Sequence, residues 1–93
     1  MAVRKLLEVS TGNITPDTME KIESGGLKVS TFSGPYGAFV YVLDSAELEQ
    51  QLITEADLLP ILAEARKNGC DWVYFDPDCD LLEGLKDYSE MWY

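Results

Sequence analysis

The stretch that decides the fold is residues 70–75, Cys-Asp-Trp-Val-Tyr-Phe. Alternation along an extended chain places Trp72 and Tyr74 on one face and Val73 and Phe75 on the other. Aromatic and β-branched residues favour strands. We predict a strand here, the last of four in the chain.

Three earlier runs show strand patterns. In residues 4–10, Leu7 and Val9 point one way between polar neighbours. Residues 27–32 and 38–43 flank a five-residue link that contains Gly and Pro, which is typical of a hairpin. The run 38–43 is hydrophobic on both faces and is therefore expected to be a central strand.

The first predicted helix covers residues 16–24. Thr15 supplies an N-cap hydroxyl, Pro16 occupies the first helical position, and Gly25 begins a Gly-Gly stop.

The second predicted helix covers residues 54–67. The run from Thr54 to Asp57 resembles a capping box, and an apolar stripe follows at helical spacing. Pro60 would lie six positions into this helix, where it should produce a kink. Residues 44–51 read as a polar connector with a possible helical turn.

The predicted order is strand, helix, strand, strand, helix, strand. This β-α-β-β-α-β order predicts an α+β fold, a ferredoxin-like sandwich in which an antiparallel sheet carries both helices on one face. The other face is left to water, to a partner or to the C-terminal tail.

The length allows one hydrophobic core. With 93 residues and 10.4 kDa, we expect a single domain over 1–93, with 77–93 as an acidic and aromatic C-terminal extension. A hydrophobic content of 46% together with five Tyr, three Phe and two Trp argues against disorder.

The charge excludes several functions. Seventeen acidic residues against seven basic ones give a net charge of −10, which excludes direct binding to nucleic acid or anionic lipid as the main activity. The sequence has no histidine, no phosphate-cradling Gly-rich loop and no zinc spacing. We therefore expect a binding protein without catalytic turnover and without a cofactor.

The chain has no signal-peptide pattern, and its longest charge-free run, residues 29–43, is too short and too broken to span a bilayer. Cys70 and Cys79 are too few for a disulfide scaffold and are expected to be reduced thiols in or near the core. These features predict a soluble, cytoplasmic protein.

The entire net charge lies after Leu43. Two acidic patches form the candidate partner-binding residues: Asp76, Asp78, Asp80, Glu83, Asp87 and Glu90 in the first, and Asp44, Glu47 and Glu49 in the second. Such a patch is either an ordinary solvated surface or an imitation of nucleic-acid phosphates that competes for a basic groove.

The spacing Asp76-x-Asp78-x-Asp80 also matches the start of a calcium-binding loop, and Asp87 would fall at position 12. Leu81 stands where the loop needs glycine, and a strand precedes it rather than a helix. A plain acidic turn without a metal is the favoured interpretation.

The aromatic residues divide into two groups. Those in predicted strands are expected to be core: Phe39, Tyr41, Trp72 and Phe75. Those in the tail are Tyr88, Trp92 and Tyr93, which either fold back on the open sheet face, the preferred reading, or form a docking segment to which Tyr88 and Trp92 contribute.

Several segments together carry a family resemblance. They are Ser10-Thr11 with Ile14-Thr15, the run Tyr-Gly-Ala-Phe-Val-Tyr-Val at 36–42, the run Cys-Asp-Trp-Val-Tyr-Phe-Asp at 70–76, Gly84-Leu85, and Tyr88 with Trp92. The chain resembles small uncharacterised acidic proteins of bacterial plasmids, integrative elements and phages. The resemblance implies a bacterial host cytoplasm and an inhibitor of the anti-CRISPR or anti-restriction type.

Two functions follow as hypotheses. The first is an acidic protein that inhibits a nucleic-acid-binding host complex by occupying its basic groove as a nucleic-acid mimic. The alternative is a small structural or regulatory module that forms a homodimer through the uncovered sheet face.

Overall fold

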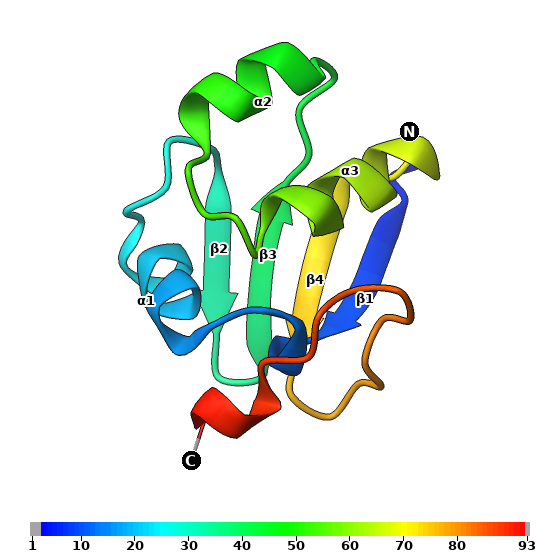
Figure 1. Ribbon diagram of the computed structural model, residues 1–93. Helices are drawn as coiled ribbons and strands as arrows, with labels where there is room; N and C mark the ends of the chain where they lie inside the picture. The colour runs from blue at the N-terminus through cyan, green and yellow to red at the C-terminus, as the bar shows by residue number, and fades with distance from the viewer. Residues whose placement is uncertain (1–2, 93) are drawn as a thin grey trace.

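The computed structural model describes residues 3–92 (Figure 1). The chain forms β1 (Leu6–Ser10), the short 3-10 helix η1 (Thr11–Asn13), α1 (Pro16–Ser24), β2 (Thr31–Gly34), β3 (Gly37–Tyr41), α2 (Ala46–Leu52), α3 (Leu59–Lys67), β4 (Trp72–Asp76) and a second 3-10 helix, η2 (Ser89–Trp92). The α+β class expected from the sequence is confirmed.

The four strands form one sheet in the order β1-β4-β3-β2. β2 pairs antiparallel with β3, and β3 antiparallel with β4, whereas β1 runs parallel to β4 with Leu6 opposite Trp72. The prediction of a fully antiparallel sheet is therefore wrong, and the ferredoxin-like topology is not confirmed. β4 is apolar on both faces and suits a central position, while β1 carries the exposed Glu8 and suits an edge.

Helices α1 and α3 lie on the same face of the sheet, and α2 lies beyond one end of the strands (Figure 1). This covered face contains the core, whose fully buried members include Val9, Val40, Val73 and Phe75. The prediction that both main helices share one face is confirmed.

The first helix has the predicted ends. The hydroxyl of Thr15 accepts the backbone N–H of Thr18 at 3.3 Å, and Pro16 occupies the first turn. Gly25 ends the helix with φ of 75°, a left-handed conformation that a residue with a Cβ rarely adopts.

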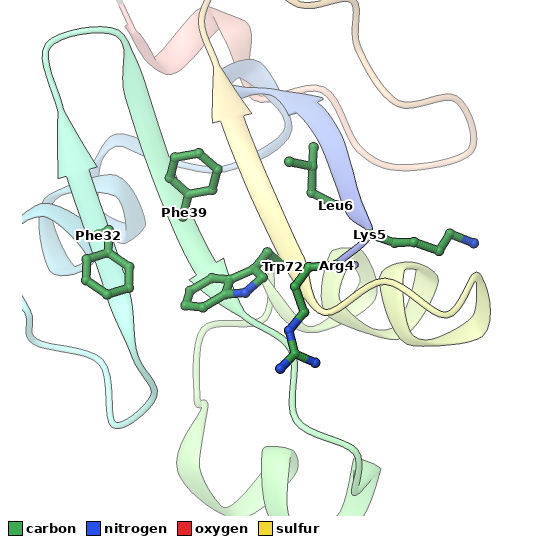
Figure 2. Close-up of a pocket in the computed structure, with 6 residues that line it drawn as sticks. All are labelled: Arg4, Lys5, Leu6, Phe32, Phe39 and Trp72. Carbon is green, nitrogen blue, oxygen red and sulfur yellow. The ribbon is translucent and has the colours of Figure 1, made fainter. Parts of the chain in front are cut away.

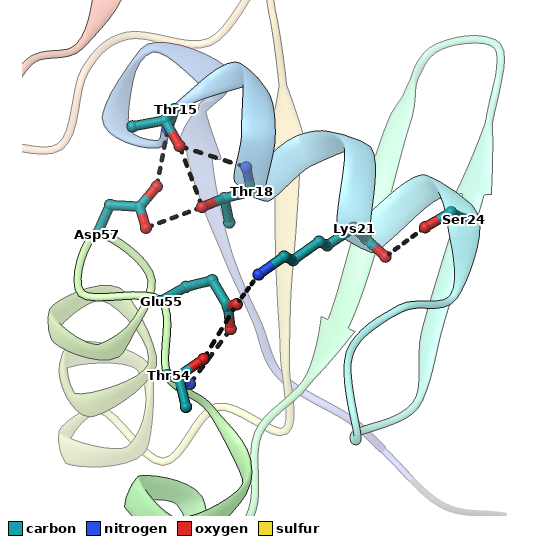
Figure 3. Close-up of polar contacts among 7 residues, drawn as sticks. All are labelled: Thr15, Thr18, Lys21, Ser24, Thr54, Glu55 and Asp57. Carbon is teal, nitrogen blue, oxygen red and sulfur yellow. Dashed lines mark hydrogen bonds and ion pairs between the residues drawn. The ribbon is translucent and has the colours of Figure 1, made fainter.

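The second main helix begins later than predicted. Because α3 starts at Leu59, Pro60 lies in the first turn, where its missing N–H breaks no helical bond, and the predicted kink is wrong. The predicted capping carboxylate serves the other helix, since Asp57 accepts the backbone N–H of Thr15 at 2.8 Å and the hydroxyl of Thr18 at 2.9 Å (Figure 3). Asp57 thereby joins the start of α1 to the link between α2 and α3.

Two further boundaries differ from the sequence prediction. Most of the polar connector at 44–51 belongs to a helix, α2, which runs on to Leu52 and is capped by the Ser45 side chain. The hairpin link is shorter than predicted, because Gly34 pairs with Gly37 and only Pro35 and Tyr36 lie between them. The hairpin itself is confirmed.

The segment 77–92 folds back against η1 on the helix side of the sheet. The buried side chain of Asn13 accepts the backbone N–H of Leu82 at 2.8 Å and donates to the carbonyl of Lys86 at 3.2 Å. Leu82 and Leu85 pack on the core. The preferred prediction, that this tail covers the open sheet face, is wrong, because Asn13 and the core offer it partners on the opposite side.

Candidate binding surfaces

The acidic turn after β4 begins at Asp76, whose side chain accepts the backbone N–H of Asp78 at 2.9 Å. Asp78 and Asp80 are exposed. Burial raises the pKa of the Tyr74 hydroxyl, and the carboxylates of Asp76, Glu8 and Asp78 raise it further. Glu8, which the sequence analysis did not select, therefore belongs to the acidic group around Tyr74.

The other carboxylates of this segment are exposed on a chain that is held in place. They are Glu83, Asp87 and Glu90. Asp87 accepts the backbone N–H and the hydroxyl of Ser89, and these hydrogen bonds lower the pKa of its carboxyl group. The backbone N–H of Tyr88 donates to the carbonyl of Gly12 at 2.7 Å.

The segment also approaches η1 closely. A Cβ on Gly12 would come within 2.8 Å of the Ser89 hydroxyl and 2.9 Å of the Leu81 side chain. A larger residue at this position would force the Ser89 and Leu81 side chains to move. We call residues 76–90 the acidic segment; its carboxylates project from a backbone that the core holds.

The second acidic patch is divided. Asp44 is exposed just before α2 and Glu47 is exposed in its first turn; α2 lies at the opposite end of the sheet from the acidic segment (Figure 1). Glu49 is 2% exposed and binds Arg66 of α3 through both carboxylate oxygens, at 2.8 and 3.1 Å. Its selection as a partner-binding residue is wrong, because it serves as an internal ion-pair partner between two helices.

The environment of Glu49 disfavours its charge. Burial raises the pKa of this carboxyl group, and the Arg66 guanidinium opposes the rise by charge and by hydrogen bonding. Without Arg66, the buried carboxylate of Glu49 would have no partner for its charge, and the contact between α2 and α3 would lose stability.

The two tail aromatics have structural contacts. Trp92 packs on the core, and its Nε1–H donates to the carbonyl of Ile14 at 3.0 Å. Tyr88 is half-buried and has the Lys86 ammonium 5.1 Å from its ring centroid. The prediction for Tyr93 lies outside the described residues. Trp92 therefore anchors the tail and is not free to dock.

The face of the sheet opposite the helices carries a layer of aromatic residues. We define this open aromatic face by Leu6, Phe32, Phe39, Tyr41, Trp72 and Tyr74. Phe39 stacks on Tyr74 at 4.6 Å between ring centroids, and Trp72 meets Tyr41 at 5.1 Å and Phe32 at 5.6 Å. The side chains of Phe32, Phe39 and Trp72 stand on this face in Figure 2.

Three of the predicted core aromatics belong to this layer. Phe75 is fully buried, as predicted. Phe39, Tyr41 and Trp72 are only half-buried, and their assignment to the core is wrong because the alternation of β3 and β4 turns them away from the helices.

Two shallow hollows lie on the open aromatic face. One, of about 230 Å³, is lined by Trp72, Phe39 and Phe32 together with Arg4 and Lys5 (Figure 2). The other, of about 250 Å³, is lined by residues that include Phe32, Phe39, Tyr36 and Tyr74.

The two ends of the face differ in charge. Arg4 lies at the Trp72 end, whereas Glu8 and Asp76 lie near Tyr74. The Lys5 side chain points away from the rings (Figure 2), and its ammonium donates to the carbonyl of Asn68 at 2.9 Å. The face is therefore apolar at its centre, basic at one end and acidic at the other.

Gly37 sets the shape of the second hollow. A Cβ there would come within 2.3 Å of the carbonyl of Phe75 and 2.8 Å of the Tyr74 ring. Glycine lets the ring of Tyr74 lie close to β3, where its hydroxyl donates to the carbonyl of Tyr36 at 3.4 Å.

Among residues 3–92, no group of three or more His, Cys, Asp or Glu side chains is arranged to hold a metal ion. The two cysteines, Cys70 and Cys79, are free and partly buried. No helix in the described part of the chain is long and apolar enough to cross a membrane.

Sequence reasoning missed Leu6 and Phe32 of the open aromatic face, and it missed the charged residues at its two ends, Arg4 and Glu8. A period-two signal was available, because Val9, Val40 and Val73 occupy one parity of their strands, together with a single ring, Phe75, while the other rings of the strands occupy the opposite parity. Small β-branched residues on the parity that helices cover, and rings on the other parity, indicate an uncovered aromatic face.

Comparison with curated proteins gives no match, and comparison with solved structures gives none either. Residues 6–90 match the C-terminal domain of a family of unknown function, DUF5983. The match includes every strand and helix described above except the last residues of η2. The chain belongs to this family.

Proposed function

We propose that this domain is a non-catalytic, acidic binding protein that occupies a basic nucleic-acid-binding surface of a partner protein, as an inhibitor of the anti-CRISPR or anti-restriction type would. The observation that supports the proposal most directly is the acidic segment. Its exposed carboxylates extend from a backbone that Asn13, Gly12 and Trp92 attach to the core.

An ordered acidic surface has a physical advantage over a loose acidic tail. Its charges are already held near one another, so binding loses less conformational entropy. The net charge of −10 attracts a basic groove at long range and accelerates encounter.

The proposal concerns the acidic segment alone. Asp44 and Glu47 lie at the other end of the sheet, and Glu49 is buried, so one groove that accepts the acidic segment does not also need the second patch. The working carboxylates are then Asp76, Asp78, Asp80, Glu83, Asp87 and Glu90, joined by Glu8.

The test is capture of partners from a bacterial host that expresses restriction or CRISPR complexes, followed by competition with DNA. We expect DNA and this protein to exclude each other, and binding to weaken as salt rises because screening shortens to about 8 Å at 0.15 M. A captured partner that binds DNA and this protein at the same time would contradict the proposal.

Matched variants locate the contact. Asp78→Asn with Asp80→Asn removes two exposed charges from the acidic segment, and Asp44→Asn with Glu47→Gln removes two from the α2 end. We expect the first pair to weaken binding about tenfold or more and the second pair to have little effect. Equal effects would mean that net charge alone, and not this segment, drives binding.

A further inference from the structure

We propose that the open aromatic face is the docking surface for a second copy of this chain, face to face, with a two-fold axis that lies in the interface and crosses the strands. This inference goes beyond the proposed function, which uses the acidic segment on another part of the surface.

The face is uncovered because the tail packs elsewhere. Residues 77–92 fold against η1 and pack on the core, on the helix side of the sheet. Phe32 is 63% exposed and Leu6 is 50% exposed there. A contiguous apolar surface of this kind on a small soluble protein marks an interaction site.

The charges at the two ends of the face favour a second copy of this chain as its partner. Arg4 lies at the Trp72 end, and Glu8 with Asp76 lies at the Tyr74 end. A two-fold axis across the strands reverses the strand direction of the second copy. The basic end of each copy then lies over the acidic end of the other, and this charge contact forms twice, as two-fold symmetry requires.

The same two-fold rotation places the aromatic side chains of one copy against those of the other. The Trp72 end of one copy lies over the Tyr74 end of its partner, so the exposed edges of these aromatic side chains meet across the interface. Aromatic pairs of this kind contribute beyond the area that they bury, and aromatic residues are enriched at the centres of interfaces.

The net charge opposes this association and gives it a recognisable salt dependence. Two copies of charge −10 repel each other, and that repulsion reaches about 30 Å at 0.01 M salt but only about 8 Å at 0.15 M. The apolar contact is not screened, so the dimer is expected to strengthen as salt rises. Binding through the acidic segment to a basic partner has the opposite salt dependence.

The experiment is sedimentation velocity of the 93-residue chain over a concentration series, at about 0.01 M and about 0.15 M salt. We expect a monomer–dimer equilibrium that shifts toward the dimer at the higher salt. A monomer at every concentration and both salts would overturn the proposal, as would a dimer that weakens with salt.

A matched pair of variants assigns the interface. Phe32→Glu places a charge on the face, and Leu48→Glu places the same charge on α2, where Leu48 is 45% exposed. Both side chains are exposed, so both variants are expected to fold, which far-UV circular dichroism checks. Phe32→Glu should weaken dimerisation about tenfold or more, and Leu48→Glu should leave it near the wild-type value. Equal weakening would place the interface elsewhere.

A charge exchange tests the direction of the two-fold axis. Arg4→Glu and Glu8→Arg should each weaken the dimer, because each places like charges over one another. The double variant exchanges the two ends and should recover most of the lost affinity. Failure to recover, with each single variant weakened, would overturn the antiparallel arrangement.

The two proposals fail separately. If Phe32→Glu abolishes the dimer while capture of a basic partner is unchanged, both stand. If Phe32→Glu abolishes capture of such a partner by a monomeric wild-type chain, the face serves that partner and the second copy is the wrong occupant. Loss of binding in the Asp78 and Asp80 variants, with the dimer intact, bears on the proposed function alone.

Discussion

The two faces of the sheet are built from different residues, although the same strands supply both. The covered face presents Val9, Val40, Val73 and Phe75, all fully buried, and the open face presents rings that remain half-exposed. Compact β-branched side chains pack closely under helices, whereas large rings keep apolar area in contact with solvent even when they pack on each other. In this protein, ring size is therefore a poor guide to burial.

The largest expected effect is on the free energy of unfolding, and it differs between the two faces of the sheet. Phe75→Ala removes a fully buried ring and should lower the free energy of unfolding by about 4 kcal/mol. Phe39→Ala removes a half-buried ring of the same size from the open face and should cost about 1–2 kcal/mol. Urea denaturation of both variants measures the contrast, and equal losses would mean that the open face is covered in solution.

The next prediction removes the ion pair between α2 and α3. Arg66→Met leaves Glu49 buried without its partner and should cost about 3 kcal/mol at pH 7. Lys67→Met is the control, because the neighbouring Lys67 is exposed. The measurement is chemical denaturation of both variants at pH 7.

The same variant has a defined pH dependence. Burial raises the folded-state pKa of Glu49 above its unfolded value, so over the interval between the two the folded chain binds more protons and stability falls as pH rises. Without Arg66 the opposing charge is gone, the pKa rises further, and the fall becomes larger. The deficit of Arg66→Met should therefore shrink as pH is lowered toward the ordinary glutamate range; a deficit that is constant with pH would contradict this account.

A third prediction detaches the tail from the covered side. Asn13→Ala leaves the N–H of Leu82 and the carbonyl of Lys86 without their partner and should cost about 2 kcal/mol. Asn68→Ala is the comparison, because exposed Asn68 contacts only Glu64 of its own helix through its side-chain amide. Limited proteolysis should cut within 77–92 faster in the first variant only.

The smallest effect is expected on the open face. Phe32→Ala removes a ring that is 63% exposed and should change the stability of the monomer by less than about 1 kcal/mol. Thermal unfolding at low protein concentration measures it. A larger loss at high protein concentration alone would reflect the second copy and not the fold of one chain.

The sequence correctly predicted the elements that are determined by residues close to one another in the chain. The helix 16–24 was correct to its ends because Thr15, Pro16 and Gly25 each act within one turn. The α+β class, the hairpin and the alternation of 72–75 were also predictable, since each depends on neighbours in sequence.

The errors concern contacts between distant segments. The sequence of Leu6–Ser10 does not indicate that this strand pairs in parallel with a strand 66 positions away. The residues around Asn13 likewise do not indicate that its side chain binds the backbone of Leu82 and Lys86. Glu49 looked like one acid among many because its cation, Arg66, lies on another helix. The acidic segment was found from charge alone, whereas the open aromatic face could be found only by comparing the strand parity of the valines with that of most of the rings.

The parallel pairing of β1 with β4 has a consequence for synthesis. β1 emerges from the ribosome before its partner strand, which begins at Trp72, so at about 5–20 residues per second β1 waits roughly 3–12 s without β4. Pulse-labelled hydrogen exchange during refolding should protect the β2–β3 hairpin before β1, and simultaneous protection would contradict this order. During that interval the nascent chain carries an unpaired strand, which makes the newest molecules the ones most exposed to chaperones and proteases.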